Sequence, residues 1–315
     1  MSSSPEGSWE HRFVSANGAR FHVVETKTEA VRPGTSGSAR RPFVLFLHGF
    51  PQAWWAWRHQ LPAIAAADYP AAAMDLRGYG ESDKPPRGYD PATLAADVAG
   101  VVASIGHRSA VLVGHGWGGY VAWTVAISHP ERTAGLVTVS APHPRAMTGS
   151  PIGLRRPALA HVLAMQPPWV PERRITSRRY LERHLRAWSS PASRFPTGAD
   201  IERCQQALAA WPAPHCVLEY HRWVVRSRLR SDGRRFAALV RKPVDVPVLM
   251  INGADDPALG RAAASVSRRS VRGPLTERTL DAAGHFPHEE QPAAVTDALL
   301  RWLSERASPG VDLAG

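Results

Sequence analysis

Apolar positions follow two different rhythms along the chain. Short apolar runs rich in β-branched residues, typical of buried strands, alternate with longer segments whose apolar residues recur at helical spacing. This alternation predicts a parallel sheet wrapped by helices, so the fold class is α/β. The predicted strands are Arg20–Glu25, Pro42–Leu47, Ala71–Leu76, Ala110–Val113, Gly135–Ser140, Pro247–Ile251 and Leu275–Leu280. The predicted helices are Trp54–Ala66, Pro91–Ile105, Gly118–Ser128, Leu259–Arg268 and Pro292–Ala307.

The alternation stops between Ser140 and Pro247, where the pattern is helical and rich in proline and arginine. We therefore expect a core domain of residues 1–145 and 243–315 and an inserted helical cap domain of residues 146–242. Such a cap would cover the carboxyl ends of the strands, where α/β sheets bind ligands. Residues 27–41 are predicted to form a polar loop, and the two ends of the chain are predicted to be disordered.

The segment from Val111 to Tyr120 is an apolar strand that turns sharply into a helix through glycines. Its outline is that of a nucleophile elbow, in which the middle residue of G-x-Nu-x-G adopts a strained turn that lifts its side chain clear of the sheet. Here the middle residue is Gly116, between Gly114 and Gly118. Glycine tolerates the strained backbone but offers no nucleophile.

A second turn, Leu47-His48-Gly49-Phe50-Pro51, also follows a predicted strand. The backbone N–H groups of Phe50 and Trp117 are therefore candidates for an oxyanion hole. In a working enzyme, removing one such donor costs roughly 3–4 kcal/mol.

Two later segments complete part of a catalytic triad. Asp256 follows the predicted strand that ends near Ile251, with Asp255 as the alternative acid, and His285 lies in a late loop. The order of elbow, acid and histidine is that of α/β hydrolases. We expect the acid to orient His285, which would act as general base toward a water.

Taken together, these segments resemble the epoxide hydrolase family of the α/β-hydrolase superfamily, and the resemblance covers most of the chain. In that family an elbow aspartate attacks the oxirane carbon, a histidine-activated water hydrolyses the ester, and two cap tyrosines protonate the opening oxygen. The family-like segments are Trp9–Val14, His48–Pro51, Trp57–Gln60, Asp75–Ser82, Gly114–Gly119, Pro142–Pro144, Asp256 and His285.

The sequence departs from this family pattern at the reacting groups. Gly116 stands where the resemblance places the aspartate, and His161 and His221 stand where it places the two tyrosines, with Tyr220 one position before His221. These residues are candidate pocket or proton-donor residues, as is His48, for which a structural role is the competing interpretation.

Other polar residues have a structural interpretation. Asp75 and Arg77 are expected to pair and shape their turn. Cys204 and Cys216 lack the spacing of a zinc site or a disulfide framework. The glycines at 114–119 lack the acidic residue about 20 positions further on that a dinucleotide site requires, so no cofactor and no metal are expected.

The net charge of +11 and the pI near 10.5 raise the possibility of nucleic-acid or anionic-membrane partners. The densest basic stretches, Arg173–Arg186 and Arg222–Arg235, also carry apolar residues at helical spacing, as amphipathic surface helices do. No run approaches the ~20 apolar residues of a membrane span, and no signal peptide is evident. We expect a cytoplasmic monomer or homodimer without nucleic-acid or membrane partners.

Two functions remain open from the sequence. The first is hydrolysis of a small hydrophobic substrate by a water activated by His285 and the acid, without the usual covalent aspartyl intermediate. The alternative is a pseudoenzyme that binds a small apolar ligand. An interaction or nucleic-acid module that uses the arginine-rich cap is the least favoured hypothesis.

Overall fold

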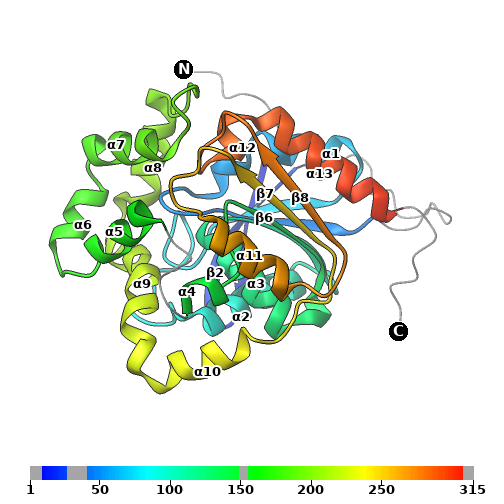
Figure 1. The fold of residues 1–315 in the computed structure, drawn as a ribbon, viewed down its shortest axis with the longest axis horizontal. Coiled ribbons are helices and arrows are strands. Elements are labelled where there is room, and N and C mark those ends of the chain that lie inside the picture. The colour runs from blue at the N-terminus through cyan, green and yellow to red at the C-terminus, as the bar shows by residue number, and fades with distance from the viewer. Residues whose placement is uncertain (1–8, 27–40, 149–154, 308–315) are drawn as a thin grey trace.

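A single eight-stranded sheet organises the computed structural model, which describes residues 9–26, 41–148 and 155–307 (Figure 1). The strand order is β1-β2-β4-β3-β5-β6-β7-β8; β1 and β2 form an antiparallel hairpin, β2 also runs antiparallel to β4, and the remaining pairs are parallel. The strands are β1 Trp9–Ala16, β2 Ala19–Thr26, β3 Phe43–Leu47, β4 Ala71–Met74, β5 Ala110–His115, β6 Thr133–Val139, β7 Val248–Gly253 and β8 Leu275–Leu280. The α/β class and all seven predicted strands are confirmed.

Helices cover both faces of the sheet, so the central strands are buried on both sides. In β3 all five residues are buried: Val44 and Phe46 pack in the apolar layer that contains residues of α1 and α13, whereas Leu45 and Leu47 pack in the layer that contains residues of α2 and α3. The helices outside the cap are α1 Gln60–Ala66, α2 Pro91–Ser104, α3 Trp117–Ser128, α4 Arg145–Thr148, α11 Arg261–Ser270, α12 Pro287–Glu290 and α13 Pro292–Ala307.

Between α4 and β7 the described part of the chain forms six α-helices, which gather at one end of the sheet (Figure 1). We call them the cap. Phe50 and Trp117, which follow the carboxyl ends of β3 and β5, both contact the ring of His221 in the cap. The predicted domain boundaries at 145 and 242 stay predictions. The cap helices are α5 Arg156–Ala164, α6 Val170–Ile175, α7 Arg178–Trp188, α8 Gly198–Ala209, α9 Ala213–Arg226 and α10 Ser231–Leu239.

Some local expectations need correction. The helix expected over Trp54–Ala66 is a 3-10 turn, Trp54–Trp57, followed by α1. β1 was not predicted because it is an edge strand whose side chains alternate between partial burial and exposure. Residues 27–40 of the predicted polar loop and both chain ends lie outside the described residues.

The expected pair between Asp75 and Arg77 is wrong. The Asp75 carboxylate accepts a hydrogen bond from the backbone N–H of Trp54 at 2.8 Å and lies 2.8 Å from Nδ1 of His22. Arg77 instead forms a buried two-pronged ion pair with Asp97, with both N–O distances at 2.6 Å. The two neighbouring residues therefore tie the loop after β4 to different elements.

Within the described ranges, no helix combines the length and the apolar character that crossing a bilayer requires.

Replacing Asp97 by alanine should lower the free energy of unfolding by about 3–5 kcal/mol, because it leaves the Arg77 guanidinium buried and unpaired. Urea unfolding followed by circular dichroism would measure the change. The double variant Arg77→Met/Asp97→Leu should lose less stability than Asp97→Ala alone. A double variant that unfolds more easily than the single one would show that burial of the charge is not the cause.

Candidate active site

The turn between β5 and α3 centres on Gly116, whose backbone has φ 51° and ψ −116°. Glycine adopts this positive φ at no steric cost, whereas other residues are strained there. A Cβ at this position would lie 3.7 Å from Cα of Gly49 and 3.7 Å from Nε2 of His285, which is ordinary van der Waals contact. The site therefore has room for a side chain that the sequence does not supply.

The neighbouring glycines have a different function. A Cβ at Gly118 would overlap the carbonyl oxygen of Leu47, and a Cβ at Gly114 would overlap the backbone of Gly118. These two glycines let β5, α3 and the end of β3 approach closely. The elbow is intact in shape, and only its central side chain is missing.

His285 is paired with Asp256, since its Nδ1 lies 2.9 Å from Oδ2 of that buried carboxylate. The other carboxylate oxygen accepts a hydrogen bond from the N–H of Ala258 at 2.7 Å. Asp255 is exposed and accepts a hydrogen bond from the hydroxyl of Ser190 at 2.6 Å, so the structure selects Asp256 as the partner of His285. With Nδ1 donating to the carboxylate, Nε2 is the nitrogen that can accept a proton.

Two distant segments hold the His285 loop in place. The backbone N–H of His285 donates to the carbonyl of Trp188 in the cap at 2.7 Å, and Nε2–H of His115 donates to the carbonyl of His285 at 2.9 Å. Burial lowers the pKa of His115 well below its usual range, so this residue stays neutral beneath the loop. The base thus depends on both the cap and the elbow for its position.

The two candidate oxyanion donors lie in the turns that follow β3 and β5. Phe50 follows the end of β3, and Trp117 is the first residue of α3. In the described part of the chain, neither backbone N–H donates to another protein group. An N–H at the first position of a helix is normally left without an intrahelical partner, and it favours negative charge.

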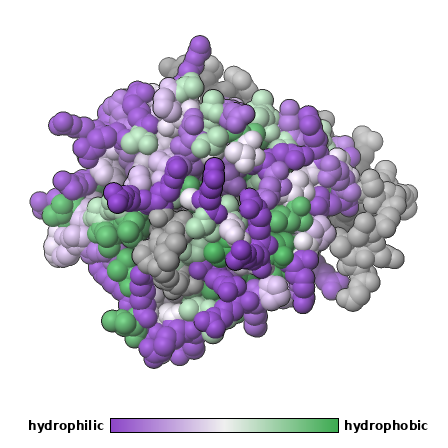
Figure 2. All heavy atoms as spheres, in the orientation of Figure 1, coloured by the Kyte–Doolittle hydropathy of each residue, from purple (hydrophilic) through white to green (hydrophobic). Residues whose placement is uncertain are grey.

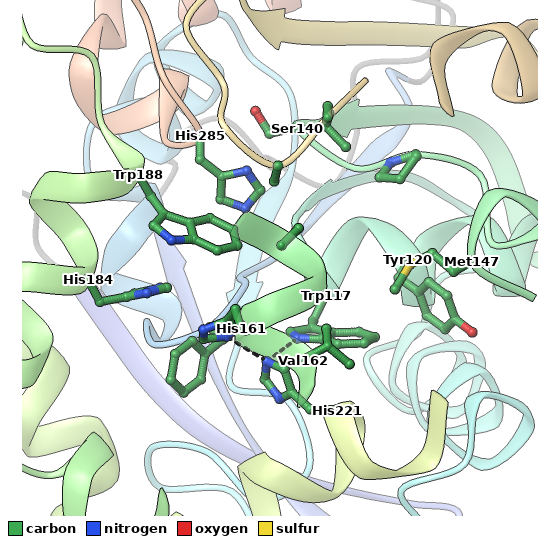
Figure 3. A pocket seen from close by; sticks show the side chains of 16 residues that line it. Trp117, Tyr120, Ser140, Met147, His161, Val162, His184, Trp188, His221 and His285 are labelled. Atoms are coloured by element: carbon green, nitrogen blue, oxygen red, sulfur yellow. Dashed lines mark hydrogen bonds between the residues drawn. The ribbon is translucent and has the colours of Figure 1, made fainter. Parts of the chain in front are cut away.

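A cavity of about 90 Å³ lies between the core and the cap and contains Gly116 and His285 in its wall (Figure 3). No Arg, Lys, Asp or Glu is among the described residues that line it. A water needs about 15 Å³ by the same measure, so the cavity has room for several waters or a small organic molecule. Its apolar lining includes Phe50, Trp117, Tyr120, Met147, Val162 and Trp188.

The cap histidines form a hydrogen-bonded cluster at this cavity (Figure 3). Nε1–H of Trp117 donates to Nε2 of His221 at 3.0 Å, and Nε2 of His161 lies 3.2 Å from the same nitrogen. Because an indole N–H can only donate, Nε2 of His221 is an acceptor, and His161 is the donor toward it. Burial lowers the pKa of His161 to about 3 and that of His221 well below its usual range, so both rings are neutral near pH 7.

The two other candidates lie outside the cavity lining. The hydroxyl of Tyr220 donates to the carbonyl of Arg77 at 2.8 Å, and Tyr220 is not among the lining residues. His48 is buried, and its Nε2 accepts a hydrogen bond from the N–H of Leu76 at 3.1 Å. Both therefore support the loop after β4.

Among the cavity residues that were not predicted from the sequence are His184, Trp188 and Ser140. His184 stacks on His161 with ring centroids 4.8 Å apart, and Trp188 contacts the ring of His285 at 4.9 Å. Ser140, directly after β6, has φ 49°, and its buried hydroxyl has no hydrogen-bond partner among the described residues. The position of Ser140 at the carboxyl end of a predicted strand was a sequence signal that could have identified it. His184 and Trp188 carry no such signal in the sequence.

No metal site is evident in the described part of the chain, where no three His, Cys, Asp or Glu residues are grouped to hold an ion.

The chain is similar in sequence and structure to epoxide hydrolases. Residues 44–298 match the alpha/beta hydrolase family. Epoxide hydrolase A of Mycobacterium tuberculosis is 32% identical over 95% of this chain and 98% of its own length, and human epoxide hydrolase 4 is 30% identical over 93% and 78%. Among solved structures, epoxide hydrolase A from Mycobacterium thermoresistibile aligns with a TM-score of 0.76 and 26% identity over 94% of this chain and 98% of that one. Cfl2 from Burkholderia cenocepacia aligns with a TM-score of 0.79 and 27% identity over 96% and 98%.

The two kinds of glycine at the elbow should respond differently to alanine. Gly116→Ala should fold and lose about 1–3 kcal/mol of stability, because only the positive φ opposes a Cβ there. Gly118→Ala should lose more than about 4 kcal/mol, because its Cβ would overlap the Leu47 carbonyl. Thermal unfolding of the two variants measures this, and equal losses would contradict the packing argument.

Proposed function

The chain belongs to the α/β-hydrolase family as an epoxide-hydrolase-like member, and from this premise we propose that it hydrolyses a small, uncharged apolar substrate. The proposed reaction is the opening of an epoxide by a water that attacks directly, without a covalent enzyme intermediate. The observation that carries this proposal is the paired His285, whose Nε2 lies 3.7 Å from the place of a Cβ on Gly116. A water at that place would take the position of the missing nucleophile.

In this reaction His285 first accepts a proton and later releases it. Nε2 of His285 takes a proton from the water while the water oxygen bonds to the oxirane carbon and the carbon–oxygen bond of the ring breaks. Asp256 stabilises the imidazolium that forms. The proton then passes from His285 to the alkoxide through solvent, which restores the neutral base and releases a diol.

One cap histidine would hold the opening oxygen by a hydrogen bond. A neutral imidazole is a very weak acid, so His161 fits the role of a neutral donor better than that of a proton source, whereas Nε2 of His221 accepts the N–H of Trp117. Nε2–H of His161 can turn from His221 to a substrate oxygen. The free N–H groups of Phe50 and Trp117 would face the attacking side, where the proposed water lies.

Ser140 supports the proposal as a second partner for the water. A buried hydroxyl without a hydrogen bond costs about 1–3 kcal/mol, and a positive φ outside glycine adds strain. Both occur in one residue that lines the cavity together with His285. A water between these two side chains would satisfy the hydroxyl and orient an oxygen lone pair.

A competing function is ligand binding without turnover. The absence of a side chain at Gly116 favours it, because removing the nucleophile from a hydrolase leaves only the modest rate enhancement that binding and an oxyanion hole provide. The same apolar cavity would then retain small uncharged molecules.

Diol formation from aryl and alkyl epoxides tests the proposal. The protein should turn over at least one of them, and His285→Ala should lower kcat by about 10²–10⁴ because the general base is lost. His129→Ala, which removes a surface histidine outside the cavity, is the matched control and should leave kcat unchanged. Stabilisation by the epoxides in thermal unfolding without any diol would favour the binding function instead.

The source of the oxygen separates direct attack from a covalent route. In a single turnover in H₂¹⁸O with the enzyme in excess, the diol should carry ¹⁸O. Gly116→Asp, which restores a carboxylate where there is room for one, should give unlabelled diol in its first turnover. Unlabelled diol from the unaltered protein would mean that one of its own side chains attacks the substrate.

The variants Ser140→Ala and Ser140→Gly test whether the Ser140 hydroxyl contributes to turnover independently of its effect on the stability of the fold. Both should lower kcat by about tenfold with little change in KM, because a hydrogen bond to the attacking water is lost. Ser140→Gly should at the same time gain about 1 kcal/mol of stability, because glycine relieves the positive φ. A stabilised Ser140→Gly variant with unchanged kcat would remove Ser140 from the mechanism.

A further inference from the structure

The loop between α5 and α6 exposes a tryptophan. The side chain of Trp169 is 73% exposed, and its backbone has φ 68°, which is uncommon for a bulky residue. Val170 beside it and Leu163 at the end of α5 are also exposed. Figure 2 shows hydrophobic side chains at the surface at the cap end, among hydrophilic ones. An exposed aromatic residue on a strained backbone suggests a function for the exposed ring.

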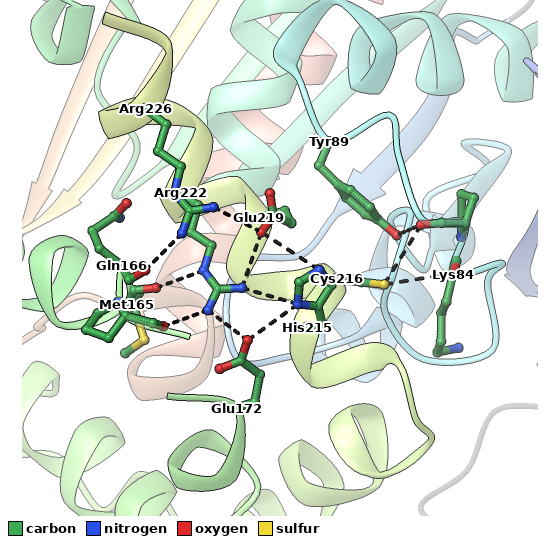
Figure 4. A network of polar contacts seen from close by, with 12 residues as sticks. Lys84, Tyr89, Met165, Gln166, Glu172, His215, Cys216, Glu219, Arg222 and Arg226 are labelled. Carbon is green, nitrogen blue, oxygen red and sulfur yellow. Dashed lines mark hydrogen bonds and ion pairs between the residues drawn. The ribbon is translucent and has the colours of Figure 1, made fainter. Parts of the chain in front are cut away.

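A buried arginine fixes this loop at both ends (Figure 4). Arg222 is 2% exposed, and its guanidinium donates to the carbonyls of Met165 at 3.1 Å and Pro167 at 2.8 Å. It also pairs with Glu172 of α6 at 2.7 Å. Trp169 lies between these anchored positions in the chain, so the fixed backbone of the loop holds its side chain in the exposed position.

The helices that follow the loop are strongly basic. The segment from 155 to 242 holds eighteen Lys and Arg against six Asp and Glu, a net charge of +12, whereas the whole chain has +11. The rest of the chain is therefore close to neutral. On α6 and α7 the two acidic residues are already paired, Glu172 with Arg222 and Glu182 with Arg186. Arg174 and Arg183 are exposed, and no carboxylate of the described residues pairs with them.

A second cavity lies on the other side of three residues that line the candidate active site. It has a volume of about 360 Å³, lies between α5, α6 and α7, and is lined in part by Arg174 and Arg183. His161, His184 and Trp188 line this cavity and also line the cavity that contains His285. Among the described lining residues these three are the ones common to both walls, so they stand between the outer cavity, which we call the vestibule, and the inner one.

We propose that Leu163, Trp169, Val170, Arg174 and Arg183, which we call the cap-tip surface, dock on the surface of an anionic lipid membrane. Tryptophan favours the membrane–water interface, and basic residues near anionic lipids add electrostatic attraction. An apolar ligand dissolved in the bilayer would then meet the vestibule at the docking face. This contact is peripheral and needs no membrane-spanning helix.

The proposal revises the expectation that the chain has no membrane partner. That expectation treated the basic stretches as ordinary amphipathic helices. The exposed Trp169, the anchoring by Arg222 and the vestibule beside Arg174 and Arg183 became visible only in three dimensions. The docking surface does not depend on the proposed hydrolysis, because lipid binding is measured without a substrate.

Co-sedimentation with vesicles tests the docking surface on the full chain. The protein should bind vesicles that contain equal amounts of phosphatidylcholine and phosphatidylglycerol, bind pure phosphatidylcholine weakly, and release in high salt. Trp169→Ala should lower the apparent association constant by about tenfold. Trp211→Ala is the matched control, because Trp211 is also on the cap and 69% exposed but lies outside the cap-tip surface.

The double variant Arg174→Glu/Arg183→Glu tests the electrostatic attraction to anionic lipids. Its affinity for the anionic vesicles should fall by about fivefold or more for each residue changed. Arg278→Glu/Arg301→Glu changes the same charge on exposed core positions and should lose much less. The proposal is overturned if the unaltered protein ignores anionic vesicles at low salt, or if each control variant loses as much binding as its cap-tip counterpart. Equal binding to neutral and anionic vesicles would also overturn it.

Discussion

The sharp turn between β5 and α3 is the constraint on which the candidate site depends. It brings the N-terminus of α3 against the end of β3, a distance that only Gly114 and Gly118 allow, and it aims position 116 at Nε2 of His285. Phe50 and Trp117 follow the same two strand ends, and their N–H groups donate to no other group in the described part of the chain. The turn keeps this geometry with glycine at its centre, so the loss of a nucleophile has left its surroundings intact.

The histidines around the cavity share one physical state, because burial holds His161, His184 and His221 in their neutral form. The hydrogen bonds that join His161, His221 and Trp117 then have fixed directions, because each nitrogen in them either donates or accepts. A cavity of this kind favours an uncharged ligand with an oxygen acceptor. It offers no cation to an anionic ligand, which distinguishes the interior of the cap from its arginine-rich exterior.

The cap therefore has two electrostatic environments, and ion pairs with little exposure fix its parts in place. Arg222 with Glu172 braces the loop that presents Trp169, and Arg58 links Asp200 of the cap to Glu289 of the core at 2.9 and 2.8 Å. His285 itself donates its backbone N–H to the cap residue Trp188. The positions of the cap and of His285 are coupled, so a shift of α7 would move His285 in the candidate active site.

The sequence alone determined the fold class, every strand of the sheet except the edge strand β1, the elbow with its empty centre and the order of acid and base, because these follow from local periodicity and from short motifs. It left Asp255 and Asp256 unresolved, because adjacent residues in a loop share the same sequence context. It could not identify Ser140, His184 or Trp188 as cavity residues, and it placed Tyr220 and His48 near a pocket that they do not line. Only the tertiary structure decided these points, because the side chains that line the cavity depend on how the inserted cap packs over the sheet. That packing brings together residues a hundred or more positions apart in the chain, such as Trp117 and His221.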